Sequence, residues 1–394
     1  MAHHEASPVG GPIMTRPFKY LLVFLAIWSV VLIWRFAAGI GAVSGLSDGY
    51  PWGIWIAFDV VTGTALACGG YAVAILCYIF NKGKYHPLVR PAILTSALGY
   101  SLAGFSIVID VGRPWLIHNI PLRVFDWNLN SALLEVALCV MAYTGVLWLE
   151  LAPAFLEKMK DASSPGLRNF AALGLRFFDK AMIWIIALGL LLPTMHQSSL
   201  GTVMLIAGDK VHGLWSTSMI PLLYLLSCVG MGYAVVVWES TVSAGTFSRP
   251  REDSMLKNLS GAMVIVLGLF LVIRLVDLVI QGRGMMMFTS GGLSVLFWVE
   301  NALFLWAMLL LGAKRRQNFS NVFRAALVII FAGALYRFDS YIVAYNPGPG
   351  WSYFPSFPEL FITFGVVGLE IALYIVIVKT FPILGGLKPS ESES

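Results

Sequence analysis

The sequence predicts an all-α integral membrane protein with about ten transmembrane helices. Of its 394 residues, 58% are hydrophobic and only 12% are charged, whereas a soluble globular domain carries about 25% charged residues. That leaves too little polar surface to cover a water-exposed fold of this size. The hydrophobic residues also fall in runs of about 20, the length at which an α-helix crosses the hydrocarbon core of a bilayer. We therefore expect membrane lipid to surround most of the chain.

Ten apolar segments follow one another along the chain. Their approximate limits are 18–43, 52–80, 91–112, 130–154, 180–204, 218–245, 259–281, 291–312, 321–344 and 359–382. An even number of spans places both chain ends on one side. We thus expect an N-terminal tail at 1–17, one polytopic transmembrane domain at 18–383 and a C-terminal tail at 384–394. Every polar stretch between the spans has the length of a loop, so no soluble catalytic domain is expected.

The positions of lysine and arginine predict the orientation. Of the 26 Lys and Arg residues, 19 lie on the side of the two chain ends, and the other seven lie in the spans or the opposite loops: Arg35, Arg113, Arg123, Lys210, Arg274, Arg283 and Arg337. Cytoplasmic loops carry the excess of positive residues in membrane proteins. Both termini are therefore predicted to be cytoplasmic. Because no basic run is interleaved with aromatic residues, nucleic acid is not an expected partner.

The opposite loops are rich in Gly, Pro, Trp and Tyr, as in GLSDGYPWG (45–53), RPWLIHNIPLRVFDWNLN (113–130) and YNPGPGWSYFPSFPE (345–359). Tryptophan and tyrosine favour the headgroup level of a bilayer, so these loops fit an interfacial aromatic belt. They equally fit a shaped surface on which a partner docks. Both interpretations remain open at the level of the sequence.

Ionisable residues inside the spans are the main functional indication. Each costs about 2.5–3.5 kcal/mol on insertion scales, so each requires a reason to be there. The set comprises Asp59, Asp110, Glu135, His196, Glu239, Asp277, Glu300, Asp339, Glu370, Arg35, Arg274 and Arg337. Arg274 and Asp277 are three residues apart on one helix face and are expected to pair; Arg337 and Asp339 lie close to a helix end. We interpret these two pairs as structural.

Depth separates the remaining groups. At 1.5 Å per helical residue, Asp59, Asp110, Glu135 and His196 fall in the non-cytoplasmic half, whereas Glu239 falls near the cytoplasmic end of its helix. A chain of Asp, Glu and His is what a proton relay through a membrane requires. His196 lies in the polar run that follows Pro193, where the helix is weakened or lines a cavity.

The inventory of metal-binding side chains excludes several redox centres. A b-type haem is usually held by two facing histidines inside helices, yet His196 is the only one of six histidines within a predicted span. The four cysteines, Cys68, Cys77, Cys139 and Cys228, form no C-x-x-C pair. We therefore expect no haem and no iron–sulfur cluster in this chain.

Four elements carry a resemblance to a known family: PWGIWIAFD (51–59), the D-x-G-R-P motif at 110–114, NSALLEVALCV (130–140) and LLPTMHQSSLG (191–201). With YFPSFPEL (353–360), they make the chain similar to the HybB-type membrane subunits of periplasmic NiFe hydrogenases, a branch of the NrfD/polysulfide-reductase membrane-subunit family. The resemblance covers nearly the whole chain. It implies two four-helix bundles, formed by spans 2–5 and 6–9, with two flanking helices.

The resemblance further implies a haem-free subunit that exchanges electrons with menaquinone or another quinone in the bacterial inner membrane. Its implied partners are a periplasmic ferredoxin-like iron–sulfur subunit and the small and large subunits of a NiFe hydrogenase. The quinone-pocket and proton-path residues of the family fall on Asp59, Tyr100, Asp110, Arg113, Glu135, His196 and Glu239. Coupling to proton movement across the membrane is expected on the same ground.

Two other classes of function fit some of the residues. A proton-coupled secondary transporter also places ionisable groups inside spans, but it usually has broken helices at the midplane and inverted repeats. A purely structural membrane anchor would leave the ionisable residues in the spans unexplained. The membrane anchor of another NrfD-type oxidoreductase would use them for a different reaction. Quinone bound to the purified protein would separate the first interpretation from the others.

Overall fold

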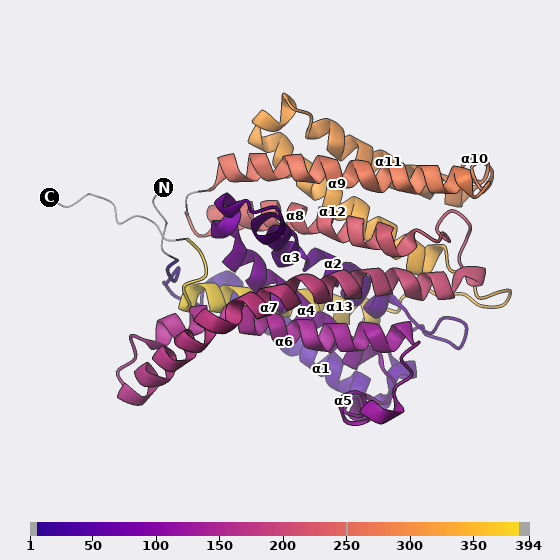
Figure 1. Cartoon of the computed structure of the whole chain (residues 1–394). Helices are drawn as coiled ribbons and strands as arrows, with labels where there is room; N and C mark the ends of the chain where they lie inside the picture. The colour runs from indigo at the N-terminus through magenta and orange to yellow at the C-terminus, as the bar shows by residue number, and fades with distance from the viewer. Residues whose placement is uncertain (1–5, 250, 386–394) are drawn as a thin grey trace.

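The computed structural model describes residues 6–249 and 251–385, and most of this part of the chain is helical. Its long helices run side by side along one axis (Figure 1). Two isolated β-bridges, Ala6 with Gly385 and Val211 with Tyr345, are the extent of β-structure in the described residues. The predicted all-α membrane fold is confirmed.

Nine helices of the described chain are long and apolar enough to cross a membrane. They are α1 (Arg16–Ala38), the composite helix Trp55–Ile79, η4 and α4 (Gly83–Asp110), α6 (Ala132–Met159), α8 (Ile220–Thr246), α9 (Asp253–Ile280), α11 (Gly292–Leu310), α12 with η9 (Phe319–Val343) and α13 (Phe357–Thr380). Each coincides with one of the predicted apolar segments. The predicted segment 180–204 lies instead within α7 (Pro165–Ile206), which is not among the nine.

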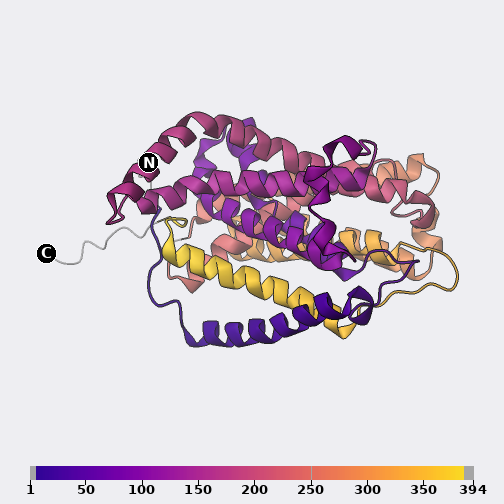
Figure 2. The same ribbon diagram turned by 90° about the horizontal axis from the view of Figure 1, so that it is seen from below.

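Helix α7 has 42 residues, which gives it a length of about 63 Å at 1.5 Å per residue. That is roughly twice the 30 Å thickness of a hydrocarbon core. Its first part extends beyond the body of the molecule beside the end of α6, and its second part packs in the body between α6 and α8 (Figures 1 and 2). The sequence located the apolar part of this helix but not its polar extension.

The helices pack as two bundles of four. The first bundle combines Trp55–Ile79 with α4, α6 and α7, and the second combines α8, α9, α11 and α12. Helices α1 and α13 pack against each other and cover α4 of the first bundle (Figure 2). The predicted arrangement of two four-helix bundles with two flanking helices agrees with this packing.

Small residues allow the two bundles to approach closely. A Cβ atom added at Gly232 of α8 would lie 2.5 Å from the carbonyl oxygen of Cys68, and one at Gly201 of α7 would lie 2.6 Å from the Cα of Pro221. Helices in membranes associate by such close backbone packing, because lipid supplies no hydrophobic driving force between them. At these glycines the backbones of the two bundles therefore lie in direct contact.

The second span is irregular. It consists of a π-helical segment, η2 (Trp55–Thr62), then α2 (Gly63–Leu66), α3 (Gly69–Ala74) and a second π-helical segment, η3 (Ile75–Ile79). A third π-helical segment, η9 (Asp339–Val343), ends the helix of α12. Such segments are rare and occur frequently at functional sites. Two buried aspartates, Asp59 and Asp339, lie on them.

Both ends of the described chain lie at one end of the molecule (Figure 1). The amide of Ser7 donates to the carbonyl of Leu384 at 3.0 Å, and Arg249 Nη2 donates to the carbonyl of Ser7 at 3.0 Å. We call this end the terminal face and the opposite end the far face. The expectation that both ends share a side is met; residues 1–5 and 386–394 of the predicted tails lie outside the described part.

Short helices occupy the loops at the two faces. At the far face these are η1 (Ile40–Ala42), η5 (Pro114–Leu116), α5 (Asn119–Leu122), η6 (Val124–Asp126), η7 (Gly208–Lys210) and α10 (Met286–Thr289). At the terminal face they are η4 (Gly83–Leu88) and η8 (Arg315–Gln317).

Candidate functional site

His196 of α7 lies at the centre of a buried hydrogen-bond network in the first bundle. Its Nε2 is 3.3 Å from the hydroxyl of Thr64 in α2. The side-chain amide of the next residue, Gln197, donates to Thr64 Oγ1 and to the hydroxyl of Tyr100 in α4, each at 3.2 Å. All four side chains are fully buried. The polar run after Pro193 therefore faces the interior of the bundle.

A second ring of side chains surrounds this network. The ring of Tyr143 from α6 stands edge-on to that of Tyr100, with centroids 4.6 Å apart, and Cys68 Sγ is 3.6 Å from the Tyr100 hydroxyl. Tyr71 of α3 meets Thr194 of α7 at 2.7 Å. Every helix of the first bundle thus contributes to one polar centre. We call Thr64, Tyr100, Tyr143, His196 and Gln197 the His196 cluster.

The cluster has unused hydrogen-bonding capacity. Thr64 donates its hydroxyl proton to the carbonyl of Val60 at 2.6 Å, so its oxygen can only accept from the imidazole. That places the histidine proton on Nε2 and leaves Nδ1 as an acceptor. Both Nδ1 of His196 and Oε1 of Gln197 are buried and have no partner in the described chain. Because buried polar atoms are normally satisfied, the two acceptors are suited to a ligand with hydroxyl groups.

Asp59 belongs to a second group, nearer the far face. From η2 its Oδ2 accepts hydrogen bonds from Thr363 of α13 at 3.1 Å and from Ser106 of α4 at 3.4 Å. Asp110 ends α4 in the same region, and its buried Oδ1 has no partner in the described chain. These two carboxyl groups lie where the first bundle meets the flanking helices.

Two other residues fix the far end of this region. Arg35 of α1 donates to the carbonyls of Ile109 and Val111 at 2.7 Å each, which satisfies the last turn of α4. The carboxylate of Glu359 in α13 accepts from the amide of Gly45 at 2.8 Å and from the Tyr353 hydroxyl at 2.9 Å. Both groups secure loops and helix ends, so we assign them a structural role.

Two further residues predicted from the sequence also lie apart from the His196 cluster. Arg113 is exposed in the loop after α4. Glu135 lies in the first turn of α6, is half-buried, and makes no side-chain hydrogen bond within the described residues. It precedes Tyr143 by eight residues, or about 12 Å along the helix. The structure therefore brings Tyr100 and His196 together but places Glu135 about two turns away on the far-face side.

Glu239 occupies the opposite end of the molecule. It is buried in α8, and its Oε1 accepts from the hydroxyl of Tyr374 in α13 at 2.8 Å. Glu370 lies one turn before Tyr374 on the same helix face. Glu239 also lines a cleft of about 1140 Å³ at the terminal face, together with polar residues that include Arg90, Glu157, Ser240, Ser243, Arg249 and Asn258. The cleft gives this buried carboxyl group a polar route toward the terminal face.

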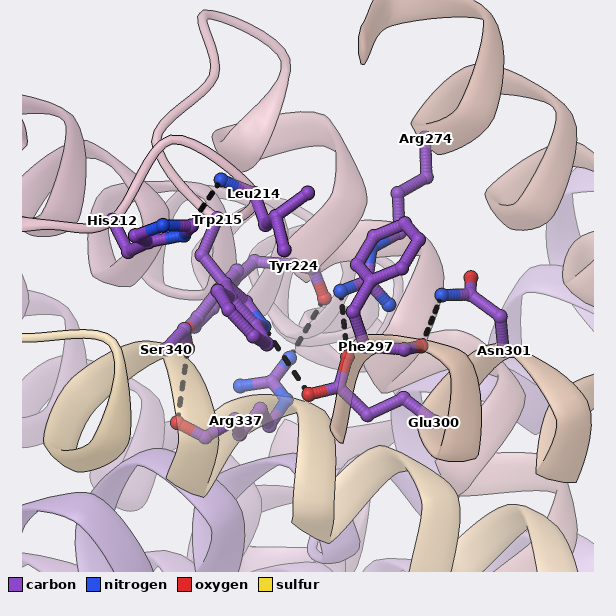
Figure 3. Close-up of polar contacts among 10 residues, drawn as sticks. All are labelled: His212, Leu214, Trp215, Tyr224, Arg274, Phe297, Glu300, Asn301, Arg337 and Ser340. Carbon is purple, nitrogen blue, oxygen red and sulfur yellow. Dashed lines mark hydrogen bonds and ion pairs between the residues drawn. The ribbon is translucent and has the colours of Figure 1, made fainter. Parts of the chain in front are cut away.

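The second bundle contains a buried ion pair that differs from the one expected. Arg274 Nη2 of α9 contacts Glu300 Oε2 of α11 at 2.6 Å, and Trp215 Nε1 donates to Glu300 Oε1 at 3.2 Å (Figure 3). The predicted pairing of Arg274 with Asp277 is wrong. Asp277 accepts instead from Gln281 at 2.7 Å and from Thr217. Arg274 points into the bundle, whereas Asp277 lies one turn closer to the far-face loops.

Arg337 of α12 lies between the two bundles, and it does not pair with Asp339. Its Nη1 donates to the carbonyl of Val61 at 2.8 Å, and its Nη2 donates to the carbonyl of Tyr224 at 2.7 Å and to the Ser227 hydroxyl at 3.0 Å. Figure 3 shows its guanidinium beside Tyr224. The sequence predicted only that Arg337 and Asp339 lie close to a helix end. It did not predict that Arg337 connects the two bundles.

The sequence of the polysulphide reductase NrfD family matches residues 42–345 of this chain. The chain belongs to the NrfD family. The match spans both four-helix bundles and the His196 cluster, and it ends before α13. The family resemblance expected from the sequence motifs is confirmed.

Several individual relatives match most of this chain. The chain is 42% identical to the probable Ni/Fe-hydrogenase 2 b-type cytochrome subunit of Escherichia coli, with 98% of this chain and 97% of the relative covered. It is 28% identical to the integral membrane subunit of menaquinone reductase from Nitratidesulfovibrio vulgaris, over 74% of this chain and 69% of that protein. A selenate reductase subunit from Mesobacillus selenatarsenatis is 22% identical over 93% and 94% of the two chains.

Sequence reasoning missed several residues of the His196 cluster and of the Glu239 contact. Thr64, Tyr143, Gln197 and Tyr374 carry no charge, so a search for ionisable residues in apolar spans could not single them out. Gln197 belongs to the polar run after Pro193, and this run was the only feature of the sequence that indicated one of these four residues. The others became recognisable only when helices far apart in the sequence were placed side by side.

Proposed function

We propose that this NrfD-family protein is the haem-free, quinone-reactive membrane subunit of a NiFe hydrogenase complex. It passes electrons between an iron–sulfur partner and menaquinone or another quinone of the membrane. The observation that carries the proposal is the His196 cluster, a buried polar centre with two unused acceptors inside a lipid-embedded bundle. The names of two relatives, a hydrogenase 2 subunit and a menaquinone reductase subunit, support it.

The residues of the cluster suit quinone chemistry. Interconversion of a quinone and its quinol moves two protons as well as two electrons, and each oxygen needs a group within about 3 Å that accepts or supplies a proton. His196 Nδ1 and Gln197 Oε1 can accept hydrogen bonds from quinol hydroxyls, and the Tyr100 hydroxyl can contribute to the same site. A histidine that accepts a proton can also return it, so the site can work in either direction.

The absence of haem is part of this proposal, although the name of the E. coli relative includes the words b-type cytochrome. Of the histidines in the described chain, His86 lies in η4 at the terminal face, and His118 and His212 lie in far-face loops. His196 is engaged through Nε2 with Thr64. A haem held by two facing histidines would therefore find no second histidine ligand beside His196 in the described chain. An optical spectrum of the purified subunit is expected to lack haem bands; a stoichiometric b-type Soret band would refute this.

The proposed topology follows from the charge distribution. With 19 of 26 Lys and Arg residues on the terminal side, the terminal face would be cytoplasmic and the far face periplasmic in a bacterial inner membrane. A periplasmic ferredoxin-like iron–sulfur subunit would then dock on the far-face loops and connect the NiFe small and large subunits to the quinone. The tails 1–17 and 384–394 would both lie in the cytoplasm.

The remaining candidate residues lie on two sides of the His196 cluster, and one side offers a route for protons. Asp59, Asp110 and Glu135 lie between the His196 cluster and the far face, and Arg113 lies in a far-face loop, whereas Glu239 lines the terminal-face cleft. We propose that protons reach the quinone from the terminal face by way of Glu239. Coupling of the electron transfer to proton movement across the membrane would result from this arrangement.

The test compares two electron acceptors in the assembled complex. His196→Ala is expected to lower hydrogen oxidation with a quinone about 100-fold or more but to leave turnover with an artificial soluble acceptor intact, because that acceptor bypasses this subunit. Glu135→Gln is expected to lower the quinone rate less, because Glu135 lies about two turns from the cluster. Copurification with the iron–sulfur and hydrogenase subunits is measured on the same preparations. Normal quinone rates in both assembled variants would move the site elsewhere.

The interrupted second span favours one competing candidate. A proton-coupled transporter often has a broken helix near its substrate site, and Ala67 and Cys68 separate α2 from α3. A further alternative, the membrane subunit of a different NrfD-type oxidoreductase, is supported by the selenate reductase relative. Lipid extraction that recovers bound quinone would exclude the transporter, and the copurifying subunits would identify the oxidoreductase.

A further inference from the structure

Arg337 is a fully buried cation at the contact between the two bundles. Its guanidinium lies over the ring of Tyr224, 4.6 Å from the centroid. Two main-chain carbonyls and one hydroxyl accept its hydrogen bonds, and its Nε has no partner in the described chain. All its partners are neutral, so the surroundings orient the cation without neutralising it.

The charges around Arg337 leave its positive charge uncompensated. It forms no ion pair with a carboxylate of the described residues, whereas Arg274 in the same bundle does so at 2.6 Å with Glu300. Asp339, two residues further along, has a buried Oδ2 without a partner in the described chain, yet it makes no contact with the guanidinium. A buried charge without a counterion costs several kcal/mol, so its retention inside a membrane indicates a function.

Arg337 contacts the same chain segment that supports the His196 cluster. Its Nη1 donates to the carbonyl of Val61, which lies about one helical turn before Thr64. Thr64 in turn meets the Nε2 of His196 at 3.3 Å. The second bundle thereby places a cation, with its Nε free of a partner in the described chain, on the segment that borders the polar centre of the first bundle.

We propose that Arg337 is the cationic anchor of the quinone site, and that the site takes naphthoquinones or quinols carrying an ionised, negatively charged oxygen. The inference rests on the proposed quinone function. A quinone that gains electrons develops negative charge on its oxygens before protons arrive, and a preorganised cation in a dry site stabilises that charge strongly. Arg337 would therefore select an anionic ligand oxygen, while His196 and Gln197 accept hydrogen bonds from neutral hydroxyls.

A purely structural role for Arg337 makes a different prediction. If the residue only ties the bundles together through Val61 and Tyr224, its loss would weaken the binding of every quinone equally. If it is an anchor for charge, only the anionic ligand would lose affinity. Two naphthoquinones of similar size separate these cases: 2-hydroxy-1,4-naphthoquinone, which is ionised at neutral pH, and its neutral 2-methoxy analogue.

The experiment measures the affinity of both probes for the full-length protein in its complex. Arg337→Gln should weaken binding of the hydroxynaphthoquinone about tenfold or more, the size of one charge-assisted hydrogen bond, and leave the methoxy analogue unchanged. Arg337→Lys should retain most of the preference. Arg35→Gln is the matched control, because Arg35 is equally buried and bonded to carbonyls, but at the flanking helix.

Wild-type protein supplies a second measurement that does not depend on the folding of a variant. As the pH falls through the ionisation of the hydroxynaphthoquinone itself, its affinity should drop toward that of the methoxy analogue. Equal affinities at neutral pH, or an equal loss of both probes in folded Arg337→Gln, would overturn the role of Arg337 but not the quinone site. Wild-type protein that binds neither probe would overturn the quinone function and this inference with it.

Discussion

The two four-helix bundles solve the burial of polar groups in different ways. In the first bundle, Gln197 donates to Thr64 and to Tyr100, and Thr64 also meets His196. In the second bundle, Arg274 and Glu300 are held as a fixed ion pair at 2.6 Å. Both bundles have four helices, so the contrast comes from their buried side chains.

The His196 cluster has two acceptors without a partner in the described chain, so a ligand can bond to it without breaking an ion pair. A buried ion pair is rigid, since loss of either partner leaves an unpaired charge in a medium that does not solvate it. We therefore expect the His196 cluster to act as a binding site and the Arg274–Glu300 pair to act as a scaffold. The following predictions test this division, beginning with the largest effect.

Removing one partner of the ion pair should damage the scaffold most. Arg274→Ala or Glu300→Ala is expected to cost about 3–5 kcal/mol, because the remaining charge stays buried and unpaired. Thermal unfolding of the detergent-purified protein measures the loss. The double variant Arg274→Met with Glu300→Met is the control and should recover much of the stability. Single variants as stable as the wild type would contradict a structural role for this pair.

His196→Ala should affect activity far more than stability. We expect hydrogen-to-quinone turnover to fall about 100-fold or more, within the range for loss of an acid–base group, with a small change in the unfolding temperature. Ser198→Ala is the matched control, because Ser198 lies on the same helix and bonds only to main-chain carbonyls of α7. Equal rates in the two variants would show that the polar centre is not the reaction site.

Glu239→Gln should slow quinone-linked turnover about tenfold, since the amide can replace the hydrogen bond to Tyr374 but cannot carry a proton. Glu157→Gln is the control: Glu157 lines the same cleft but is half-exposed and paired with Arg90 at 2.6 Å. Rates are compared in proteoliposomes. A loss in Glu157→Gln that matches that of Glu239→Gln would mean that the cleft, and not this carboxyl group, matters.

The smallest effect is expected at the chain ends. Arg249→Ala removes the hydrogen bonds to the carbonyls of Ser7 and Gly385 and should loosen both segments at a cost below about 1 kcal/mol. Faster proteolysis of the N-terminal segment, with unchanged quinone turnover, is the expected readout. Arg251→Ala is the comparison, because Arg251 pairs locally with Asp253. Identical proteolysis of the two variants would exclude the role of Arg249 in holding the ends.

The sequence by itself determined the properties that belong to single segments. Apolar runs of about 20 residues located the spans, since the cost of exposing polar groups to lipid accumulates residue by residue along each helix. The same reasoning found His196, because an ionisable residue in an apolar run stands out. The two bundles and the family followed from motifs such as the polar run at 193–199.

Only the tertiary structure decided which side chains meet. Arg274 was expected to pair three residues away, but its partner is 26 residues away on another helix. Glu135 and His196 share a depth in the sequence-based count, yet they lie on different parts of the bundle. Tyr374 and Glu239 are separated by 135 residues and share a hydrogen bond. A hydropathy pattern contains no information on how one helix is rotated against another. That rotation decides which partners a buried polar group meets.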